Sequence, residues 1–316
     1  MPADQAPILL AYDGSDHSKE AIRRAAALMP GRRAVVVSVW QSLGALLLYG
    51  DTGTMPVALA DARQELDEED RRNGERIAAE GAELARAAGL DAAPEAIEGP
   101  ARIWPKLIDA ASRHAAAPIV VGARGLSGVK SALLGSVSQG VLHHAHVPVL
   151  VVPPAAEGAP GEPSGPVVFG FDGSDEARHA IERGAQLLRG RALVASVWIS
   201  TRDAAPAAML GTPVAVLGDA VERIDDEIEQ ETERRAAAGA EVARAAGLEA
   251  TSRAVVCAGN VWARLCQLAK EEDASALVVG SHGHGRLAAM LLGSVSRGVA
   301  HHAPAPALIV PPEGGR

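Results

Sequence analysis

Short apolar runs alternate with longer amphipathic segments along this chain. In the first half, the apolar runs are "PILLAYD", "RAVVVSVW", "PIVVG" and "VPVLVVP", and a weaker run, "PEAIEG", lies between the second and third of them. Brief apolar runs separated by helical segments are typical of parallel strands covered on both faces. The pattern predicts an α/β domain with a doubly wound, five-stranded parallel sheet.

The segments between these runs have the spacing of helices. Small and apolar residues recur at helical intervals over 15–29, 59–88, 103–115 and 136–144, and we predict helices there. Residues 62–86 mix charges of both signs, which is typical of the solvent-facing side of a long helix. A coiled-coil partner surface is the alternative for that segment.

The second half of the chain repeats the first. "LLAYDGSD" (9–16) matches "VFGFDGSD" (168–175), and "GSVSQGVLHHAHVPVLVVPP" (135–154) matches "GSVSRGVAHHAPAPALIVPP" (293–312). A repeat of this length indicates tandem domains rather than a solenoid. We predict one domain at 1–153, a linker rich in Pro and Gly at 154–166, and a second domain at 167–316.

The net charge and the cysteine content bear on the binding partners and the cellular compartment of the protein. The net charge is −9 over 316 residues, which argues against a nucleic acid or an anionic membrane as partner. Two cysteines, Cys257 and Cys266, lack metal-site spacing and fit buried positions in a reducing compartment. The N-terminal residues do not resemble a signal peptide, and no apolar run could span a bilayer. We therefore expect a cytoplasmic protein.

A glycine pattern occurs once in each half. "GARGLSGVKSALLGSVSQG" (122–140) is repeated as "GSHGHGRLAAMLLGSVSRG" (280–298), with the glycines in the same places. The pattern follows the fourth predicted strand, and ligands of open parallel sheets bind at the carboxyl ends of strands. Glycines allow close backbone approach, and a helix N-terminus attracts anions.

These features predict a phosphate-binding loop that differs from the common P-loop, since GxxxxGK[ST] is absent. Gly122 and Gly125 would approach the ligand, Gly135, Ser136 and Val137 would open the helix, and Ser136 and Ser138 would add hydroxyls. The alternative is a tight turn before a helix that Ser136 caps.

An aspartate ends the first strand of each half. Asp13 and Asp172 both belong to a "DGSD" stretch, in which Gly14 and Gly173 follow them. A carboxylate at this edge of the sheet could accept hydrogen bonds from ribose hydroxyls or an adenine amine. The alternative is a helix cap, for which Ser15 or Asp16 would serve equally well.

Taken together, the strand-one Asp, the G-x2-G-x9-G-[ST] spacing and the closing "HHAxxPxLxVP" resemble the universal stress proteins of the ATP-binding kind. The resemblance covers nearly the whole chain as two units. It implies a stress-response or regulatory protein that binds ATP, with or without Mg²⁺, at one adenine nucleotide site per domain. The implied binding residues are Asp13, Gly14, Val39, Gly122, Arg124, Gly125, Gly135, Ser136, Val137 and Ser138, and Asp172, Gly173, Val197, Gly280, His282, Gly283, Gly293, Ser294, Val295 and Ser296.

The resemblance also has implications for assembly. Members of the family pair edge to edge through their fifth strands, which implies pairing of the two domains within the chain and a homodimer of chains. The cysteine that usually precedes the closing proline is replaced by Val147 and by Ala305. The glycine pattern itself is complete in both halves.

The sequence also raises the questions of a metal site and of enzymatic turnover. Histidines at 143, 144, 146, 301 and 302 suggest a metal site, but adjacent histidines point apart, so a solvated helix end is favoured. The chain shows no repeated acid–base dyad, so a nucleotide-binding protein is favoured over a slow ATPase or nucleotidyl-transfer enzyme. A third alternative is a structural stress protein whose sites hold no ligand.

Overall fold

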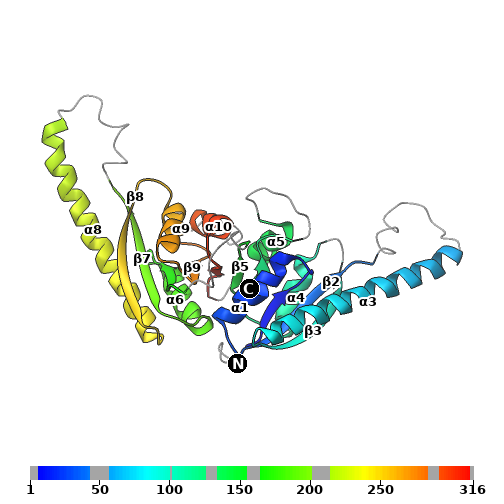
Figure 1. The fold of residues 1–316 in the computed structure, drawn as a ribbon. Coiled ribbons are helices and arrows are strands. Elements are labelled where there is room, and N and C mark those ends of the chain that lie inside the picture. The colour runs from blue at the N-terminus through cyan, green and yellow to red at the C-terminus, as the bar shows by residue number, and fades with distance from the viewer. Residues whose placement is uncertain are drawn as a thin grey trace. The chain divides into compact units, whose positions relative to one another are not determined.

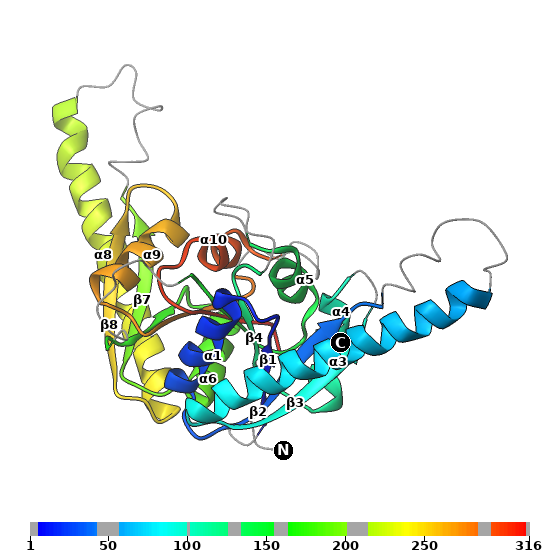
Figure 2. The same ribbon diagram turned by 45° about the vertical axis from the view of Figure 1, so that its right-hand side comes forward.

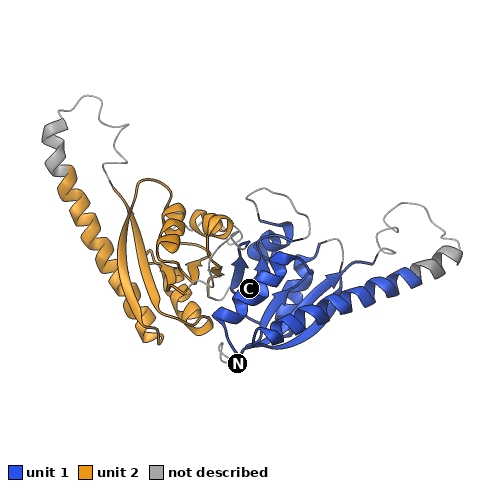
Figure 3. Cartoon of the chain, in the orientation of Figure 1, with its two compact units in different colours: residues 1–157 blue, residues 158–316 orange. Residues whose placement is uncertain are grey.

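Two units of nearly equal length make up the chain, residues 1–157 and 158–316 (Figure 3). The computed structural model describes residues 6–42, 57–99, 102–125, 134–154, 164–200, 214–283 and 292–313, and the side chains of 57–63 and 214–220 are not described. No helix in these ranges is both long and apolar enough to cross a membrane.

Unit 1 alternates strands and helices in the predicted order (Figure 1). Its strands are β1 (Ile8–Ala11), β2 (Arg33–Trp40), β3 (Asp91–Glu98), β4 (Ile119–Gly122) and β5 (Val149–Val152). Its helices are α1 (Asp16–Leu28), α3 (Val57–Ala87), α4 (Trp104–Arg113) and α5 (Ser136–His144). The strands are all parallel and lie in the order β3-β2-β1-β4-β5.

Unit 2 repeats this arrangement element by element. Its strands are β6 (Val167–Gly170), β7 (Ala192–Ile199), β8 (Ala250–Cys257), β9 (Ala276–Gly280) and β10 (Ala307–Val310). Its helices are α6 (Asp175–Leu187), α8 (Val214–Ala245), α9 (Val261–Glu271) and α10 (Ser294–His302). The order β8-β7-β6-β9-β10, again all parallel, confirms the predicted fold of two doubly wound α/β domains.

Helices cover both faces of each sheet, which is why the central strands are apolar throughout. In unit 1, α3 runs along β2 and β3 and packs beside α1, while α4 and α5 contact each other on the opposite face (Figure 2). Ile8, Leu9 and Leu10 of β1 are at most 1% exposed. A strand buried on both faces has no polar side, so it reads as a continuous apolar run.

The third strand differs from its prediction. The run "PEAIEG" places the start at Pro94, whereas β3 begins at Asp91 and Pro94 pairs with Val36 inside it. β3 is the edge strand of the unit 1 sheet, so it has a hydrogen-bonded neighbour, β2, on one side only. A proline, which lacks the backbone N–H, is tolerated in such an edge strand. The proline therefore lies within the strand rather than at its start.

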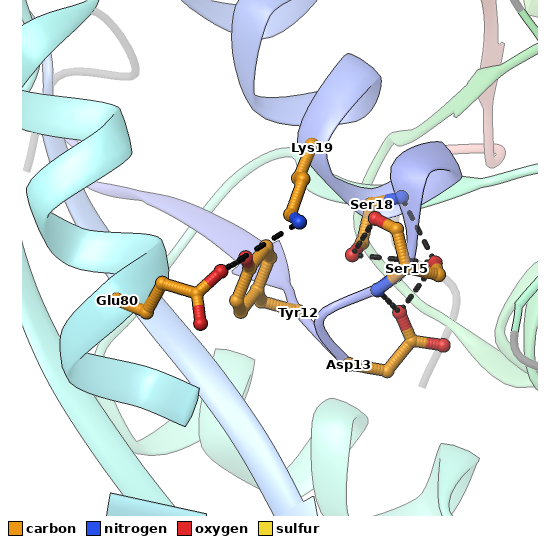
Figure 4. A network of polar contacts seen from close by, with 6 residues as sticks. All are labelled: Tyr12, Asp13, Ser15, Ser18, Lys19 and Glu80. Atoms are coloured by element: carbon orange, nitrogen blue, oxygen red, sulfur yellow. Dashed lines mark hydrogen bonds and ion pairs between the residues drawn. The ribbon is translucent and has the colours of Figure 1, made fainter. Parts of the chain in front are cut away.

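Tyr12 joins the end of β1 to the long helix α3 (Figure 4). Its hydroxyl donates to Glu80 Oε1 at 2.7 Å, and Lys19 Nζ lies 3.8 Å from the same oxygen. The ring reaches α3 because Gly81 has no side chain: a Cβ there would lie 2.6 Å from Tyr12 Cδ1. Burial, the hydrogen bond to Glu80 and the nearby carboxylates raise the pKa of the Tyr12 phenol well above its usual value.

We expect Gly81→Ala to destabilise the protein, although alanine is the better helix former. The new methyl group would also lie 2.8 Å from Val36 Cγ1, so it overpacks two buried neighbours, a cost of about 1–3 kcal/mol. Urea denaturation measures the change. Gly259→Ala is the control, because a Cβ at Gly259 meets no atom within 4 Å. A gain in stability for Gly81→Ala would contradict the contact.

A second expectation concerns Tyr12→Phe. Loss of the hydrogen bond should lower the free energy of unfolding by about 0.5–1.5 kcal/mol at neutral pH. A raised pKa in the folded state means that the phenol stabilises the fold below about pH 10 and loses this contribution at higher pH. Urea titrations should therefore show that the difference between the proteins shrinks above about pH 10. A difference that grows with pH would contradict this assignment.

Candidate functional site

The candidate site of unit 1 lies where the strand order reverses. The chain leaves β1 toward β2 and β3 on one side and reaches β4 and β5 on the other, so a crevice opens at the carboxyl ends of β1 and β4. A cavity of about 370 Å³ occupies this edge. Its lining comes from the ends of β1, β2 and β4, from helices α3 and α4, and from the start of α5.

Asp13 is held at the mouth of this cavity by a turn (Figure 4). Its Oδ1 accepts hydrogen bonds from the backbone N–H of Ser15 at 3.0 Å and from Ser15 Oγ at 2.6 Å. Gly14, with φ of +81°, supplies the left-handed residue that the turn needs. The second oxygen, Oδ2, faces Gly125: a Cβ on Gly125 would lie only 2.8 Å from it.

The same turn is built in unit 2. Asp172 Oδ1 accepts from Ser174 N at 3.0 Å and from Ser174 Oγ at 2.6 Å, and Gly173 has φ of +90°. A Cβ on Gly283 would lie 2.5 Å from Asp172 Oδ2. Both aspartates are therefore directed toward the second glycine of the pattern.

Neither aspartate caps the helix that follows it. The N-caps of α1 and α6 are Ser15 and Ser174, whose side chains accept from the N–H groups of Ser18 and Ala177. A serine caps each helix, so the helix-cap alternative for Asp13 and Asp172 is wrong. Their outer oxygens are turned toward the site instead.

The first glycine of the pattern lines the cavity in unit 1 and also has a role in packing. A Cβ on Gly122 would lie 3.0 Å from the carbonyl oxygen of His17 and 3.1 Å from that of Arg124. Gly280 meets the corresponding carbonyls of Glu176 and His282 at 3.2 and 3.1 Å. These glycines let the first turn of a helix approach the strand, so their lack of a side chain serves packing.

The N-terminus of α5 presents its backbone to the cavity. Gly135 is the N-cap, its N–H donates to Ala123 O at 2.8 Å, and the helical ladder begins with Gln139 N donating to Gly135 O at 2.9 Å. The N–H groups of Ser136, Val137 and Ser138 therefore have no acceptor within the helix. These three residues line the cavity, and the same three positions in unit 2 are Ser294, Val295 and Ser296.

Two serine expectations need correction. Ser136 does not cap α5, because Gly135 does so without any side-chain hydrogen bond. The buried hydroxyl of Ser138 donates to Gly122 O at 2.6 Å, and that of Ser296 donates to Gly280 O at 2.7 Å. These hydroxyl hydrogens fasten the helix to the strand, so Ser138 and Ser296 offer an anion their backbone N–H groups, while the exposed Ser136 at the cavity keeps its hydroxyl as well.

The residues between the glycines differ in the two units. Arg124 lines the cavity of unit 1. His282, its counterpart, has Nδ1 at 3.0 Å from Ser281 Oγ, while its Nε2 is buried without a hydrogen-bond partner.

The other end of the unit 1 cavity is largely apolar. Val39 comes from the end of β2, and its counterpart Val197 is half-buried at the end of β7. The sequence did not reveal the rest of this wall, because the strand and helix patterns gave those residues an ordinary core role. They are Trp40 of β2, Gly74 and Ile77 of α3, and Leu107 of α4, together with Ile103 just before α4.

A tryptophan links the two helices that close the site on the other face. Trp104 of α4 stacks on His144 of α5 with 4.2 Å between ring centroids and 11° between planes. Gly140 makes room for it, since a Cβ there would overlap the indole. Trp262, Gly298 and His302 repeat the arrangement, with ring centroids at 4.7 Å.

This stacking accounts for one histidine of each adjacent pair. Among the described residues, no group of three or more His, Cys, Asp or Glu side chains is placed to hold a metal ion. Cys257 and Cys266 are buried free thiols, as expected, and burial raises the pKa of the Cys266 thiol to about 11.

The sequence profile of the universal stress protein family matches residues 6–153 and again 164–311. A universal stress protein of Mycolicibacterium smegmatis is 34% identical over 215 residues, 65% of each chain, so the match spans slightly less than two thirds of that relative.

One solved structure supports the fold over the whole chain. A universal stress protein of Archaeoglobus fulgidus superposes over 99% of this chain and 98% of its own, with a TM-score of 0.57 and 22% identity. Another solved universal stress protein, described in complex with cAMP, is 29% identical over 47% of this chain and 98% of its own, with a TM-score of 0.32. With a family match that covers both units, this chain belongs to the universal stress protein family.

Proposed function

We propose that this protein binds ATP, one molecule in each unit, and acts as a nucleotide-dependent regulatory protein of the cytoplasmic stress response. One observation carries the proposal. Asp13 Oδ2, Gly125 and the unpaired N–H groups at the start of α5 converge at the mouth of a cavity whose far wall is largely apolar. Such a site offers donors for anions, an acceptor for hydroxyls and an apolar surface for a base.

The residues fit the parts of an adenine nucleotide in order. The N–H groups of Ser136, Val137 and Ser138 would hold phosphate oxygens, aided by the charge of Arg124. Asp13 would accept hydrogen bonds from ribose hydroxyls, because its Oδ1 is already engaged by Ser15 and its Oδ2 faces the site. The adenine would lie against Val39 and the apolar wall.

Magnesium, if it accompanies the nucleotide, would be carried mainly by the phosphates. The part of the chain that the structure describes has no cluster of three carboxylates or histidines for a metal. Mg²⁺ commonly keeps several waters and takes only one or two protein carboxylates beside the phosphates.

A binding role is favoured over turnover. Hydrolysis requires a base that positions a water molecule near the terminal phosphate. Of the residues that the structure describes, two carboxylates line the cavity: Asp13 lies beside Gly125, where its position suits the sugar, and Asp70 belongs to α3, the helix that contributes Gly74 and Ile77 to the apolar wall. A slow ATPase or nucleotidyl-transfer enzyme is the alternative, and phosphate release over hours by the purified protein would reveal it. Pairing of the two domains and dimerisation of chains stay predictions from the sequence.

Calorimetry of nucleotide-free protein with ATP should give a stoichiometry near two per chain. A thermal shift should accompany it, because a ligand at about 100 times its Kd adds about 2.7 kcal/mol of stability. Cyclic AMP, found in a relative, is the rival ligand to titrate in parallel. Absence of both heat and thermal shift with millimolar ATP would exclude the proposed function.

Gly125→Val and Gly283→Val should each remove one of the two sites. The new side chain would strike the outer oxygen of Asp13 or of Asp172, which lies within 2.8 Å of the added Cβ, and would fill the mouth of the site. Titration with ATP should give a stoichiometry near one for each variant. Gly259→Val, at an open position, should leave it near two. A folded Gly125→Val protein that still binds two ATP molecules would show that this loop does not hold the phosphates.

A further inference from the structure

The long helices α3 and α8 hold the same register in their units, so their residues can be compared position by position. Near one end, Ser42 Oγ donates to Asp67 Oδ1 at 2.5 Å, as Ser200 Oγ donates to Asp225 Oδ2 at 2.6 Å. Farther along, Gly81 faces the ring of Tyr12, as Gly239 faces that of Phe171. Between these matched contacts, the residues directed at the site differ.

Gly74 forms a notch in α3 that receives the indole of Trp40. A Cβ on Gly74 would lie 2.7 Å from Trp40 Cδ1 and 2.9 Å from its Cβ, so the ring rests on bare helix backbone. Gly74 and Trp40 both line the unit 1 cavity. Because Gly74 has no side chain, the Trp40 ring can lie against the backbone of α3, which leaves the middle of the unit 1 cavity open.

Thr232 fills the same notch in unit 2. It is 1% exposed, and its hydroxyl donates to Ile228 O at 2.7 Å, so its methyl group and Cβ occupy helix surface that is bare in α3. Trp198 therefore cannot rest on α8 as Trp40 rests on α3. Trp198 is 9% exposed, and its Nε1 is buried with no hydrogen-bond partner. The wall that Gly74 and Trp40 form in unit 1 is therefore built differently in unit 2.

Arg235 adds a second difference, because its counterpart in unit 1 is Ile77. The Cδ and Nε atoms of Arg235 lie 3.4 and 3.7 Å from the position of a Cβ on Gly173, whereas Gly14 has no atom within 4 Å of that position. Arg234 and Arg235 line one hollow together with Asp172 and Glu231, and Arg234 is ion-paired with Glu231 at 3.2 Å. Unit 2 thus places positive charge beside the aspartate turn where unit 1 has an apolar side chain.

We propose that the two sites differ in ligand selectivity: unit 1 recognises a nucleoside triphosphate by its base and sugar, and unit 2 recognises mainly the polyphosphate. The inference rests on the proposed nucleotide function and deepens it. Loss of base contact weakens ATP binding in unit 2, while the guanidinium of Arg235 favours any highly charged polyphosphate.

The test uses the two single-site proteins, Gly283→Val for unit 1 and Gly125→Val for unit 2, with ATP and inorganic tripolyphosphate as ligands. In the unit 1 protein, ATP should bind at least about tenfold more tightly than tripolyphosphate, since an apolar pocket contributes factors of this size. In the unit 2 protein, the two ligands should bind within about threefold of each other, and Arg235→Ile should weaken both.

Exchanging the notch residues tests the cause. Gly74→Thr in the unit 1 protein should lower ATP affinity about tenfold and leave tripolyphosphate affinity unchanged. Thr232→Gly in the unit 2 protein should raise ATP affinity and restore preference for ATP. Arg72→Thr, on the exposed side of α3, controls for the helix propensity of threonine. Thermal melts establish that each variant is folded, and Thr232→Gly decides the question if Gly74→Thr does not fold.

The possible results distinguish a failure of this inference from a failure of the proposed ATP-binding function. If neither single-site protein binds ATP, the nucleotide function is wrong. If both bind ATP with equal affinity and equal preference over tripolyphosphate, and the notch exchanges change nothing, the function stands and the proposed difference between the sites is wrong.

Discussion

The hydrogen bonds that Ser15 gives to Asp13 set the geometry on which the candidate site depends. They hold one carboxylate oxygen in a turn whose direction Gly14 permits, so the other oxygen must point across the crevice toward Gly125. The loop after β4 can approach because Gly125 has no side chain. Ser138 then fastens the start of α5 to the end of β4, which aims three backbone N–H groups into the same space.

Duplication has kept this polar frame and altered the walls around it. The aspartate turns have the same hydrogen bonds at the same distances in both units, 3.0 and 2.6 Å. The helix N-termini correspond as well, although Ser296 donates to Ser281 O in addition to Gly280 O. Apart from Arg124 and His282 in the loops after β4 and β9, the differing site positions described above lie on the long helices. In this fold the ligand lies at the strand ends. The loops and helix N-terminus that would hold the anion are therefore separate from the long-helix residues that would select the rest of the ligand.

The sequence predicted most of the fold, because its strong signals were local. Apolar runs identified the strands, and the predicted bounds of α5 agree with the structure. The errors came from contacts between distant segments. Nothing near Gly122 in the sequence shows that the backbone of His17 lies against it, and nothing near Ser138 shows that its hydroxyl meets Gly122 O. The walls from α3 and α4 were missed for the same reason, since a residue that lines a cavity has the same helical spacing as one in the core.

Trp104, which stacks on His144 beside Gly140, belongs to a set of tryptophans whose positions make fluorescence informative. The chain contains four tryptophans, and each unit has one at the end of its second strand and one stacked on a histidine between its last two helices. Every indole therefore lies in or beside a wall of a candidate site. The tryptophan fluorescence of this protein therefore comes from these four positions alone, and excitation that selects indoles over the two tyrosines makes the emission report on them.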